Sequence, residues 1–568
     1  MRIISVFLLV FFFCVVKSQN FIHVNQLGYY CNSPKMAMLT DMEAESYTIR
    51  DVATNSVVYS GECPEAKHWS MSGEKVQFVD FTNFKTAGSY YLQIGSNRSY
   101  PFVIGDDGIL DSLSVWSLKA FYLWRCSCPI EKKYATFNNT SYAREEGHPD
   151  TVVYVHKSAA SELRHVESEI SASKGWYDAG DYNKYVVNAG FSAAFFMMAY
   201  ELYPNYYDSL NTNIPESDNS VADILDELKW ELDWLLNMQD PYDGGVYFKL
   251  TNLRYSGMVE PGKDKQERYV VGKSTSSALN FASTMAFASR IYSSIDSVYS
   301  KKLLSASEKA YAWAKIKPNV SFSNPKDVFT GEYSDSTFDD EFFYANVELF
   351  LTTKDVKYFD QLNLNQLFES PLWHKQNTFG LMDLVINIDR LPDYVDKNFI
   401  KVKFRSLADN VYKQYYYSVG KLPLKKFEWG SNGCVATNGV ILAIAHKFFG
   451  DNKYLYGATA ALDYLLGRNS VDYCFVSMFG SLYPKHIHDR RSYSDDIYDP
   501  LPGYLCGGPN KDQLTDCGQS NYPSSNYPAR AYLDEMCSYS TNEIAINWNA
   551  PLMMLVGAVI NQTKEGKK

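Results

Sequence analysis

The hydrophobic periodicity of this chain changes once, at the short segment Gly105-Asp-Asp-Gly108. Before it, runs such as Val76-Gln-Phe-Val-Asp-Phe and Tyr90-Tyr-Leu-Gln-Ile are short and regularly spaced, as in the strands of a sandwich. After it, apolar residues recur at helical spacing, as in residues 221–236, where Ser220 is a candidate N-cap. The sequence therefore predicts a β-sandwich over residues 20–105 and an all-α domain, an array or a toroid, over residues 109–562.

The helical part contains further predicted helices separated by long loops. The spacing predicts helices at residues 275–292, 305–314, 340–351, 438–449 and 454–466. The segments between them are rich in Gly, Pro, Tyr and Asp, especially residues 480–530. Loops this long in a compact domain usually carry function, so we expect the functional residues to lie on them.

The first eighteen residues have the pattern of a signal peptide. Arg2 supplies a positive charge, residues 3–16 form an apolar run, and Ser18 is a small residue at a plausible cleavage position. A signal anchor is the alternative, although the run is short for a membrane span. We therefore expect residues 1–18 to be removed and the mature chain to be secreted, with no membrane contact, as a monomer.

Nine cysteines lie outside the predicted signal peptide, so at least one cannot pair within the chain. Cys517 and Cys537 flank the loop before residue 543 and are candidates for a disulfide, which secretion permits. Cys506 is a competing partner for Cys517. A zinc site at Cys126-Ser-Cys128 is disfavoured, because zinc fingers space their cysteines by two to four residues.

Composition limits the possible partners. The formal net charge is −11, which argues against nucleic acid as a partner, because binding phosphates requires a basic surface. Aromatic residues make up 15% of the chain. They suit either a large aromatic core or a cleft in which aromatic faces stack on sugar rings.

Two acidic segments are candidates for chemistry. In Gly175-Trp-Tyr-Asp178-Ala-Gly-Asp181, two carboxyl groups are separated only by small residues, so they can converge on one ligand. A calcium loop or a solvated turn would explain the same pattern. Glu543 precedes the apolar residues 544–552, which would raise its pKa as a general acid requires, although it could be an exposed glutamate at a helix start. Hydrolysis of a glycosidic bond needs such a pair of carboxyl groups.

These segments resemble glycoside hydrolase family 9, in its branch with an N-terminal immunoglobulin-like domain. The resemblance rests on Asp178-Ala-Gly-Asp181, residues 532–550, Phe475-Val-Ser-Met-Phe-Gly480 with His488-Asp-Arg490, and Val24-Asn-Gln-Leu-Gly-Tyr29. It covers residues 21–557 and implies an (α/α)6 barrel after the sandwich. It also implies a fixed contact between the two domains through the strand at residues 25–29. Since the linker at residues 105–108 is too short for a flexible spacer, we predict rigid packing.

The resemblance also implies roles for individual residues. Asp181 would be the general base, Asp178 its helper in holding the water, and Glu543 the general acid. Asp534 and Tyr539 would lie in the surrounding shell, and His488 and Arg490 would hold sugar hydroxyls. Trp429 is the best candidate for a sugar platform, with a core tryptophan as the alternative, and Trp176 is a further candidate for substrate binding.

The chain departs from the family pattern in several places. Many members carry a histidine and a tryptophan that grip the sugar where this chain has residues 246–251, and Leu482 also departs from the signature. Val155-His156 stands near the place where some members use a Cys-His pair for zinc, so we expect no zinc there. Asp340 and Glu341 resemble part of a family calcium loop and could bind structural calcium, although a helix N-terminus with acids in its first turn explains them equally well.

The sequence thus favours a secreted inverting hydrolase of β-1,4-glucan or cello-oligosaccharides that needs no cofactor for its chemistry. An exo-acting β-glucosidase or glucosaminidase is the alternative enzyme, because the altered residues 246–251 could close one end of the cleft. A catalytically idle glycan-binding protein is the alternative from another class, and it would be favoured if Asp181 or Glu543 were missing. Inversion predicts a separation of roughly 6.5–9.5 Å between the carboxyl groups of Asp181 and Glu543.

Overall fold

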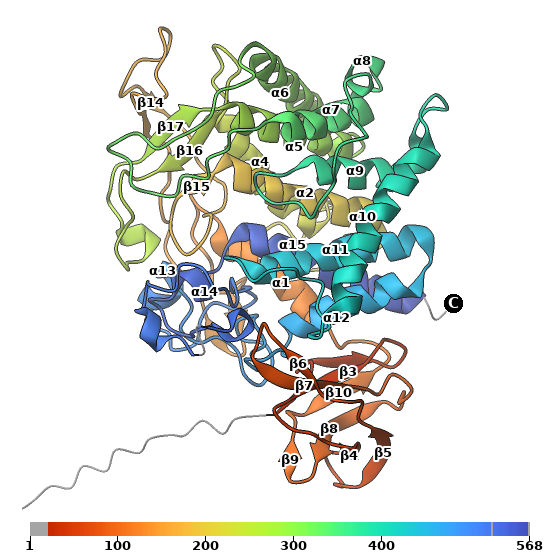
Figure 1. The fold of residues 1–568 in the computed structure, drawn as a ribbon. Coiled ribbons are helices and arrows are strands. Elements are labelled where there is room, and N and C mark those ends of the chain that lie inside the picture. The colour runs from red at the N-terminus through yellow and green to blue at the C-terminus, as the bar shows by residue number, and fades with distance from the viewer. Residues whose placement is uncertain (1–20, 524–525, 566–568) are drawn as a thin grey trace, which may run out of the picture.

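The computed structural model describes residues 21–523 and 526–565 (Figure 1). The predicted signal peptide lies outside the described residues. A β-rich domain at the N-terminus is followed by a helical domain, and Figure 1 shows the strands gathered beneath the helices. No described helix is both long and apolar enough to cross a membrane.

The N-terminal domain consists of two sheets packed face to face. One sheet has the order β1 (Ile22–His23), β3 (Met36–Thr40), β7 (Glu74–Asp80), β6 (Lys67–Trp69). The other has the order β2 (Gly28–Tyr30), β10 (Phe102–Gly105), β8 (Gly88–Ile94), β4 (Ser46–Asp51), β5 (Val57–Glu62), with β9 (Asn97–Arg98) beside β8. Buried side chains of both sheets, such as Leu39, Val79 and Leu92, form one core, so the domain is a sandwich as predicted.

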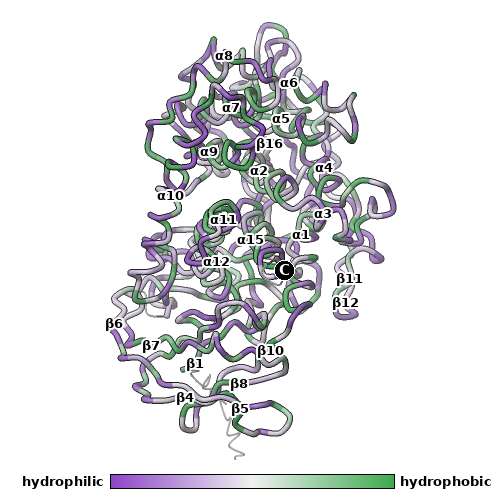
Figure 2. Tube along the Cα trace, turned by 90° about the vertical axis from the view of Figure 1, so that its right-hand side faces the viewer, coloured by the Kyte–Doolittle hydropathy of each residue, from purple (hydrophilic) through white to green (hydrophobic). Residues whose placement is uncertain are grey.

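The helical domain is built around a closed circuit of six helices. In order of contact they are α2 (Val186–Leu202), α5 (Thr275–Tyr292), α7 (Asp339–Thr353), α9 (Asn377–Ile386), α11 (Ser431–Phe449) and α15 (Ile546–Glu565), and α15 packs again on α2. Further helices pack outside this circuit: α1 (Asp111–Trp124), α4 (Asp223–Asn237), α6 (Ser297–Ile316), α8 (Val356–Phe359), α10 (Lys397–Tyr417) and α12 (Asn452–Leu465). Short helices α3 (Pro204–Ser209), α13 (Arg490–Ser494) and α14 (Tyr539–Asn542) lie in the connections. Figure 2 shows apolar residues along these packed helices.

The helices predicted from periodicity are present, but α6 and α11 begin at Ser297 and Ser431, several residues before the predicted starts at 305 and 438. The helix expected from residue 221 is α4, which begins at Asp223 after Ala222, with no side-chain cap. Ser220 is therefore not its N-cap. The acids of the first turn, Asp223 and Asp226, supply the negative charge that stabilises this end of the helix instead.

A five-stranded sheet lies beside the helical circuit and ends next to α2. Its order is β14 (Glu169–Ile170), β13 (Val153–Val155), β17 (Tyr269–Lys273), β16 (Tyr247–Thr251), β15 (Lys184–Tyr185), and a separate pair is formed by β11 (Thr136–Phe137) and β12 (Thr140–Ser141). Strand β15 follows Asp181 directly and leads into α2. The sheet therefore holds the segment that carries the first pair of acids.

The two domains contact one another through buried polar groups. Asn25 donates from Nδ2 to Oδ1 of Asp463 at 2.8 Å, and His23 contacts Asp472 at 2.9 Å. The side-chain oxygen of Gln26 accepts from the backbone N–H groups of Ser481 and Leu482. These contacts agree with the predicted rigid packing through the strand at residues 25–29.

Candidate active site

A cleft opens where the segments that precede helices of the six-helix circuit meet. Its volume is ≈ 490 Å³, within the usual range for ligand sites. Its lining comes from the residues before α2, α7, α9, α11 and α15: Asp178, Asp181, Tyr333, Trp373, Trp429 and Glu543.

The two aspartates of the first motif are held by different partners. Asp178 accepts from Nδ2 of Asn188 at 3.0 Å and from the hydroxyl of Tyr333 at 2.9 Å. Asp181 accepts from both the backbone N–H and the Nδ2 of Asn183, at 3.2 and 2.7 Å. Burial, and then the charge of Asp181, raise the pKa of Asp178 to about 7.

Packing against a neighbouring segment requires a small residue at Gly180, between Asp178 and Asp181. A Cβ on Gly180 would lie 2.1 Å from the carbonyl oxygen of His488, so no larger residue fits between the two segments. This close approach brings the Asp181 loop against the segment that leads to Glu543, because His488 and Glu543 form a parallel bridge. Motifs more than three hundred residues apart in the sequence are therefore fixed together.

Glu543 lies in the extended segment between α14 and α15, and its side chain faces the cleft. Its carbonyl accepts from the N–H of Gly507 at 2.8 Å, which holds the backbone. Burial and the negative charges of Asp181 and Asp178 raise the pKa of Glu543 well above its ordinary value, while Arg490 acts in the opposite direction. Glu543 therefore keeps its proton to higher pH than an exposed glutamate, as a general acid must.

Trp429 is 40% exposed and lines the cleft, so it is not a core tryptophan. Its ring lies 5.8 Å from that of Tyr539, and Tyr539 lies 5.9 Å from His488. An exposed indole beside the acids is placed to stack on a sugar ring.

The other shell residues bind the protein itself. Asp534 accepts from the backbone N–H groups of Lys485 and His486 and from Asn542. Arg490 donates to the carbonyls of Ser256 and Gly180.

His488 is bonded at Nδ1 to the carbonyl of Met536, and burial lowers its pKa. His488, Arg490 and Asp534 thus help to hold the loops that carry the acids, and contact of His488 and Arg490 with sugar hydroxyls stays a prediction.

Trp176 corrects the sequence-based expectation. It is 1% exposed, its indole donates to Glu227 at 2.8 Å, and its ring packs on Phe121 and Phe196. Its side chain therefore lies in the core beneath the acid motif and does not contact substrate.

Residues 246–251 also lie away from the cleft. Val246 and the whole of β16 are buried, and none of these residues lines the cleft. The altered segment therefore does not close one end of the cleft, and the argument for an exo-acting enzyme loses its basis.

Tyr333, Trp373 and His374 are among the residues of the cleft wall that the sequence did not predict. Tyr333 binds Asp178, its ring lies 5.4 Å from that of Trp373, and His374 follows in the same wall. Tyr333 has a left-handed backbone (φ 47°), which an aromatic residue rarely adopts. Only its position in a long loop before a predicted helix could have drawn attention to it.

The predicted calcium ligands converge in the structure. Glu341 is buried, and the carboxyl groups of Asp340 and Asp335 lie against its own carboxyl group; burial and then these two acids raise the pKa of Glu341 well above its ordinary value. Asp340 accepts from the N–H of Gln376. Within residues 21–523 and 526–565, no set of three His, Cys, Asp or Glu side chains has metal-binding geometry, but the neighbouring oxygens of Asp340 and Glu341 are of the kind that a hard cation binds.

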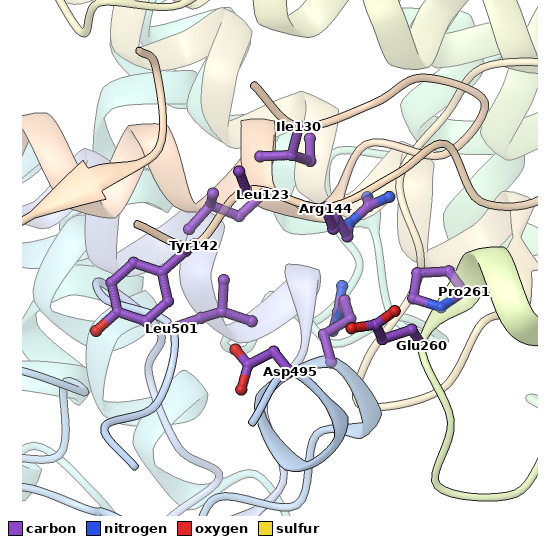
Figure 3. Close-up of a pocket in the computed structure, with 10 residues that line it drawn as sticks. Leu123, Ile130, Tyr142, Arg144, Glu260, Pro261, Asp495 and Leu501 are labelled. Carbon is purple, nitrogen blue, oxygen red and sulfur yellow. The ribbon is translucent and has the colours of Figure 1, made fainter. Parts of the chain in front are cut away.

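A second cavity lies behind the acid motif (Figure 3). Figure 3 shows Asp495 and Leu501 facing Leu123 and Tyr142 across it. Its volume is ≈ 20 Å³, room for about one water molecule, so it is not a second substrate site. Arg491 borders it and donates to the carbonyl of Ala179, which supports the motif from behind.

The geometry agrees with comparisons to known proteins. The sequence profile of glycosyl hydrolase family 9 matches residues 112–556. The chain belongs to glycoside hydrolase family 9. The profile of the cellulase N-terminal ig-like domain matches residues 17–99. The predicted family, its immunoglobulin-like module and the glycoside hydrolase class are thereby confirmed.

Several relatives in family 9 align over nearly the whole chain. A xyloglucan-specific endo-β-1,4-glucanase of Bacteroides ovatus is 40% identical over 562 residues, covering 95% of this chain and 93% of the relative. Endoglucanase D of Acetivibrio thermocellus is 30% identical over 549 residues, covering 95% and 83%. A solved structure of a Bacteroides ovatus family 9 protein superposes with a TM-score of 0.89 at 37% identity, covering 96% of this chain and 99% of that one.

Proposed function

We propose that this family 9 hydrolase is an inverting endo-β-1,4-glucanase. The observation that carries the proposal is the single cleft lined by Asp178, Asp181, Glu543 and the exposed ring of Trp429. Aromatic faces bind the apolar faces of pyranoses, and paired carboxyl groups supply the acid and the base.

The proposed roles follow from the environment of each acid. Glu543, which retains its proton, protonates the oxygen of the bond that is cleaved. Asp181 removes a proton from the attacking water, and Asp178 helps to hold that water. The proton lost by water and the proton gained by the leaving sugar balance, and no cofactor takes part.

We propose that the six-helix circuit is the inner ring of an (α/α)6 barrel. The helices packed outside it, α1, α4, α6, α8, α10 and α12, would form the outer ring. The segments before the inner helices then meet at one end of the barrel, which explains why distant motifs line one cleft.

The proposed substrates are β-1,4-glucan chains and cello-oligosaccharides. Because the Bacteroides ovatus relative is xyloglucan-specific, xyloglucan is tested beside soluble cellulose. We expect viscosity to fall before many reducing ends form, and cellohexaose to give mixed shorter products. Release of single sugars from one end would show an exo-acting enzyme, and no products at all would show a glycan-binding protein.

We further propose a structural calcium ion at Asp340 and Glu341. Calcium would neutralise the buried carboxyl group of Glu341, whose neighbours Asp340 and Asp335 are themselves acidic. Added Ca²⁺ should raise the melting temperature of the chelator-treated enzyme, and Glu341→Gln should abolish that rise. An equal melting temperature with and without Ca²⁺ would reject the site.

Secretion and a monomeric state complete the proposal. Removal of residues 1–18 and recovery from the medium would support secretion, and elution at about the chain mass would support a monomer.

A further inference from the structure

Lys249 lies in the middle of β16, behind the catalytic wall, and is 0% exposed. Its ammonium group donates to Oδ1 of Asn324 at 2.7 Å, to the carbonyl of Gly331 at 2.7 Å and to Oγ1 of Thr330 at 3.1 Å. These three acceptors match the three protons of an ammonium group. Burial lowers the pKa of Lys249 to about 7, while the charges of Asp181 and Glu332 act in the opposite direction.

One path from Lys249 leads to Asp178. The carbonyl of Gly331 is fixed by the ammonium, and Tyr333, two residues further, donates its hydroxyl to Asp178 at 2.9 Å. The left-handed backbone of Tyr333 is strained for a bulky residue, so the loop needs anchors to keep it. Lys249 is such an anchor from the sheet side.

A second path leads to Asp181. An ammonium group can only donate, so the hydroxyl proton of Thr330 is free to point to Oγ1 of Thr251, 2.8 Å away. Because Thr251 accepts this proton, its own hydroxyl proton is directed to Oδ1 of Asn183 at 2.8 Å or to the carbonyl of Asn252 at 2.7 Å. With its oxygen engaged there, Asn183 presents its Nδ2 to Asp181 at 2.7 Å.

We infer that Lys249 is a positioning residue that sets the orientation of both Asp178 and Asp181 through these two hydrogen-bonded paths. The inference rests on the proposed function, since it concerns the carboxyl groups that hold and activate water. Without the ammonium, the Thr330 hydroxyl loses its fixed direction, and the Asn183 oxygen is then held by the backbone N–H of Asn252 at 3.3 Å and by a less restrained Thr251. An amide rotated to present its oxygen would repel the carboxylate of Asp181.

A purely structural role predicts a different result. Phe248 stacks on Phe322 at 3.8 Å and ties the same loop to the sheet, so the loop has other attachments. If Lys249 served only the fold, its loss would lower stability and leave turnover by the folded enzyme unchanged.

The first test compares Lys249→Met with Lys273→Met. Lys273 lies on the neighbouring strand β17 and binds Asp240 and Asp243 at 2.7 and 2.9 Å, away from the cleft. We expect kcat on cellohexaose to fall on the order of tenfold or more in Lys249→Met with KM within about threefold, because the lost interaction acts on chemistry. Lys273→Met should keep kcat within about twofold of wild type.

Melting temperature and circular dichroism show whether each variant is folded. Thr330→Val keeps the ammonium and breaks only the second path, so it tests the relay if Lys249→Met folds poorly. It should lower kcat without a matching change in KM. Unchanged kcat in folded Lys249→Met, or in Thr330→Val, overturns the inference.

A double-mutant cycle tests the route to Asp178. If Lys249 acts through Tyr333, then Lys249→Met and Tyr333→Phe together should lower kcat by less than the product of their separate effects. A double variant whose loss of kcat equals the product of the two separate losses would contradict the first path. A wild-type enzyme without glucanase activity would instead refute the proposed function, so the two failures are distinguishable.

Discussion

At the scale of single residues, the three carboxyl groups proposed to act in catalysis lie in different environments. Glu543 and Asp178 have raised pKa values because burial penalises their charged forms, and Asp178 also accepts two hydrogen bonds. Asp181 is bound only by the backbone and side chain of Asn183. These environments separate a proton donor from a proton acceptor within one cleft.

The roles proposed for Glu543 and Asp181 predict that their substitutions affect substrates with good and poor leaving groups differently. Glu543→Gln should lower kcat on unactivated glucan by several orders of magnitude but retain activity on an aryl cellobioside with a good leaving group, since that bond needs no acid. Asp181→Asn should lose both activities, because no base remains. Equal losses on both substrates for Glu543→Gln would reject its role as the acid.

Asp178 should also make stability depend on pH. Its pKa in the folded protein is about 7, above that of an unfolded aspartate, so the folded protein binds the proton more tightly. Burial of this carboxyl group therefore does not lower the free energy of unfolding below about pH 4, and it lowers that free energy progressively as pH rises from about 4 to about 7. At neutral pH the cost is at most about 4 kcal/mol.

Asp178→Asn should accordingly raise the melting temperature at pH 7 and have less effect at pH 4.5. Thermal melts of both proteins at the two pH values measure the difference. A variant that is less stable than wild type by the same amount at both values would contradict the account.

At the scale of elements, the loop before Glu543 is closed by a disulfide. Cys517 and Cys537 are bonded, with Cα atoms 5.3 Å apart, which confirms the predicted pair over the competing Cys506. Just outside this loop, Asp516 accepts from the N–H of Ser540 on α14. The disulfide therefore restrains the segment that ends at Glu543.

Replacing both cysteines by serine should lower the free energy of unfolding by about 3 kcal/mol, the value expected for a loop of this length. Melts with and without reductant check this: the wild type should lose stability on reduction, and the double variant should not respond. A wild type whose melting temperature stays the same after the disulfide is shown to be reduced would contradict the prediction.

Several features of these elements could be predicted from the sequence and others could not. Periodicity located α5, α7 and α12, because burial of one face leaves a local pattern. The acid motif was visible because small residues separate its aspartates. Tyr333 and Lys249 were not visible, because their roles depend on contacts with residues about eighty or more positions away. The prediction that Trp176 binds substrate was wrong, because the sequence does not show whether an indole beside an acid faces the cleft or the core.

At the scale of the whole molecule, the sandwich is joined to the helical domain near the cleft. Trp69 lies 6.3 Å from Phe427, two residues before Trp429, and Glu74 pairs with Arg530 at 3.6 Å. Asn25 donates to the buried Asp463, whose pKa burial raises to about 6. The sandwich thus supports the loops that line the cleft, and its removal would expose a buried surface.

Deleting residues 20–105 should therefore lower the melting temperature or cause aggregation. As a smaller change, Asn25→Ala should cost about 1–3 kcal/mol of stability, because Asp463 would lose its donor. Thr48→Ala on β4, which Figure 1 places on the far side of the sandwich, is the control and should have little effect. A truncated enzyme that folds equally well and loses only its affinity for insoluble glucan would show a tethered binding module.

The central claim is that water, activated by Asp181, displaces the leaving sugar directly while Glu543 protonates it. Proton NMR of cellohexaose hydrolysis, recorded before mutarotation, reports the anomer that is formed first. Direct displacement at a β-linkage predicts that the α-anomer appears first and the β-anomer grows in later. Initial appearance of the β-anomer would show a covalent intermediate and contradict the account.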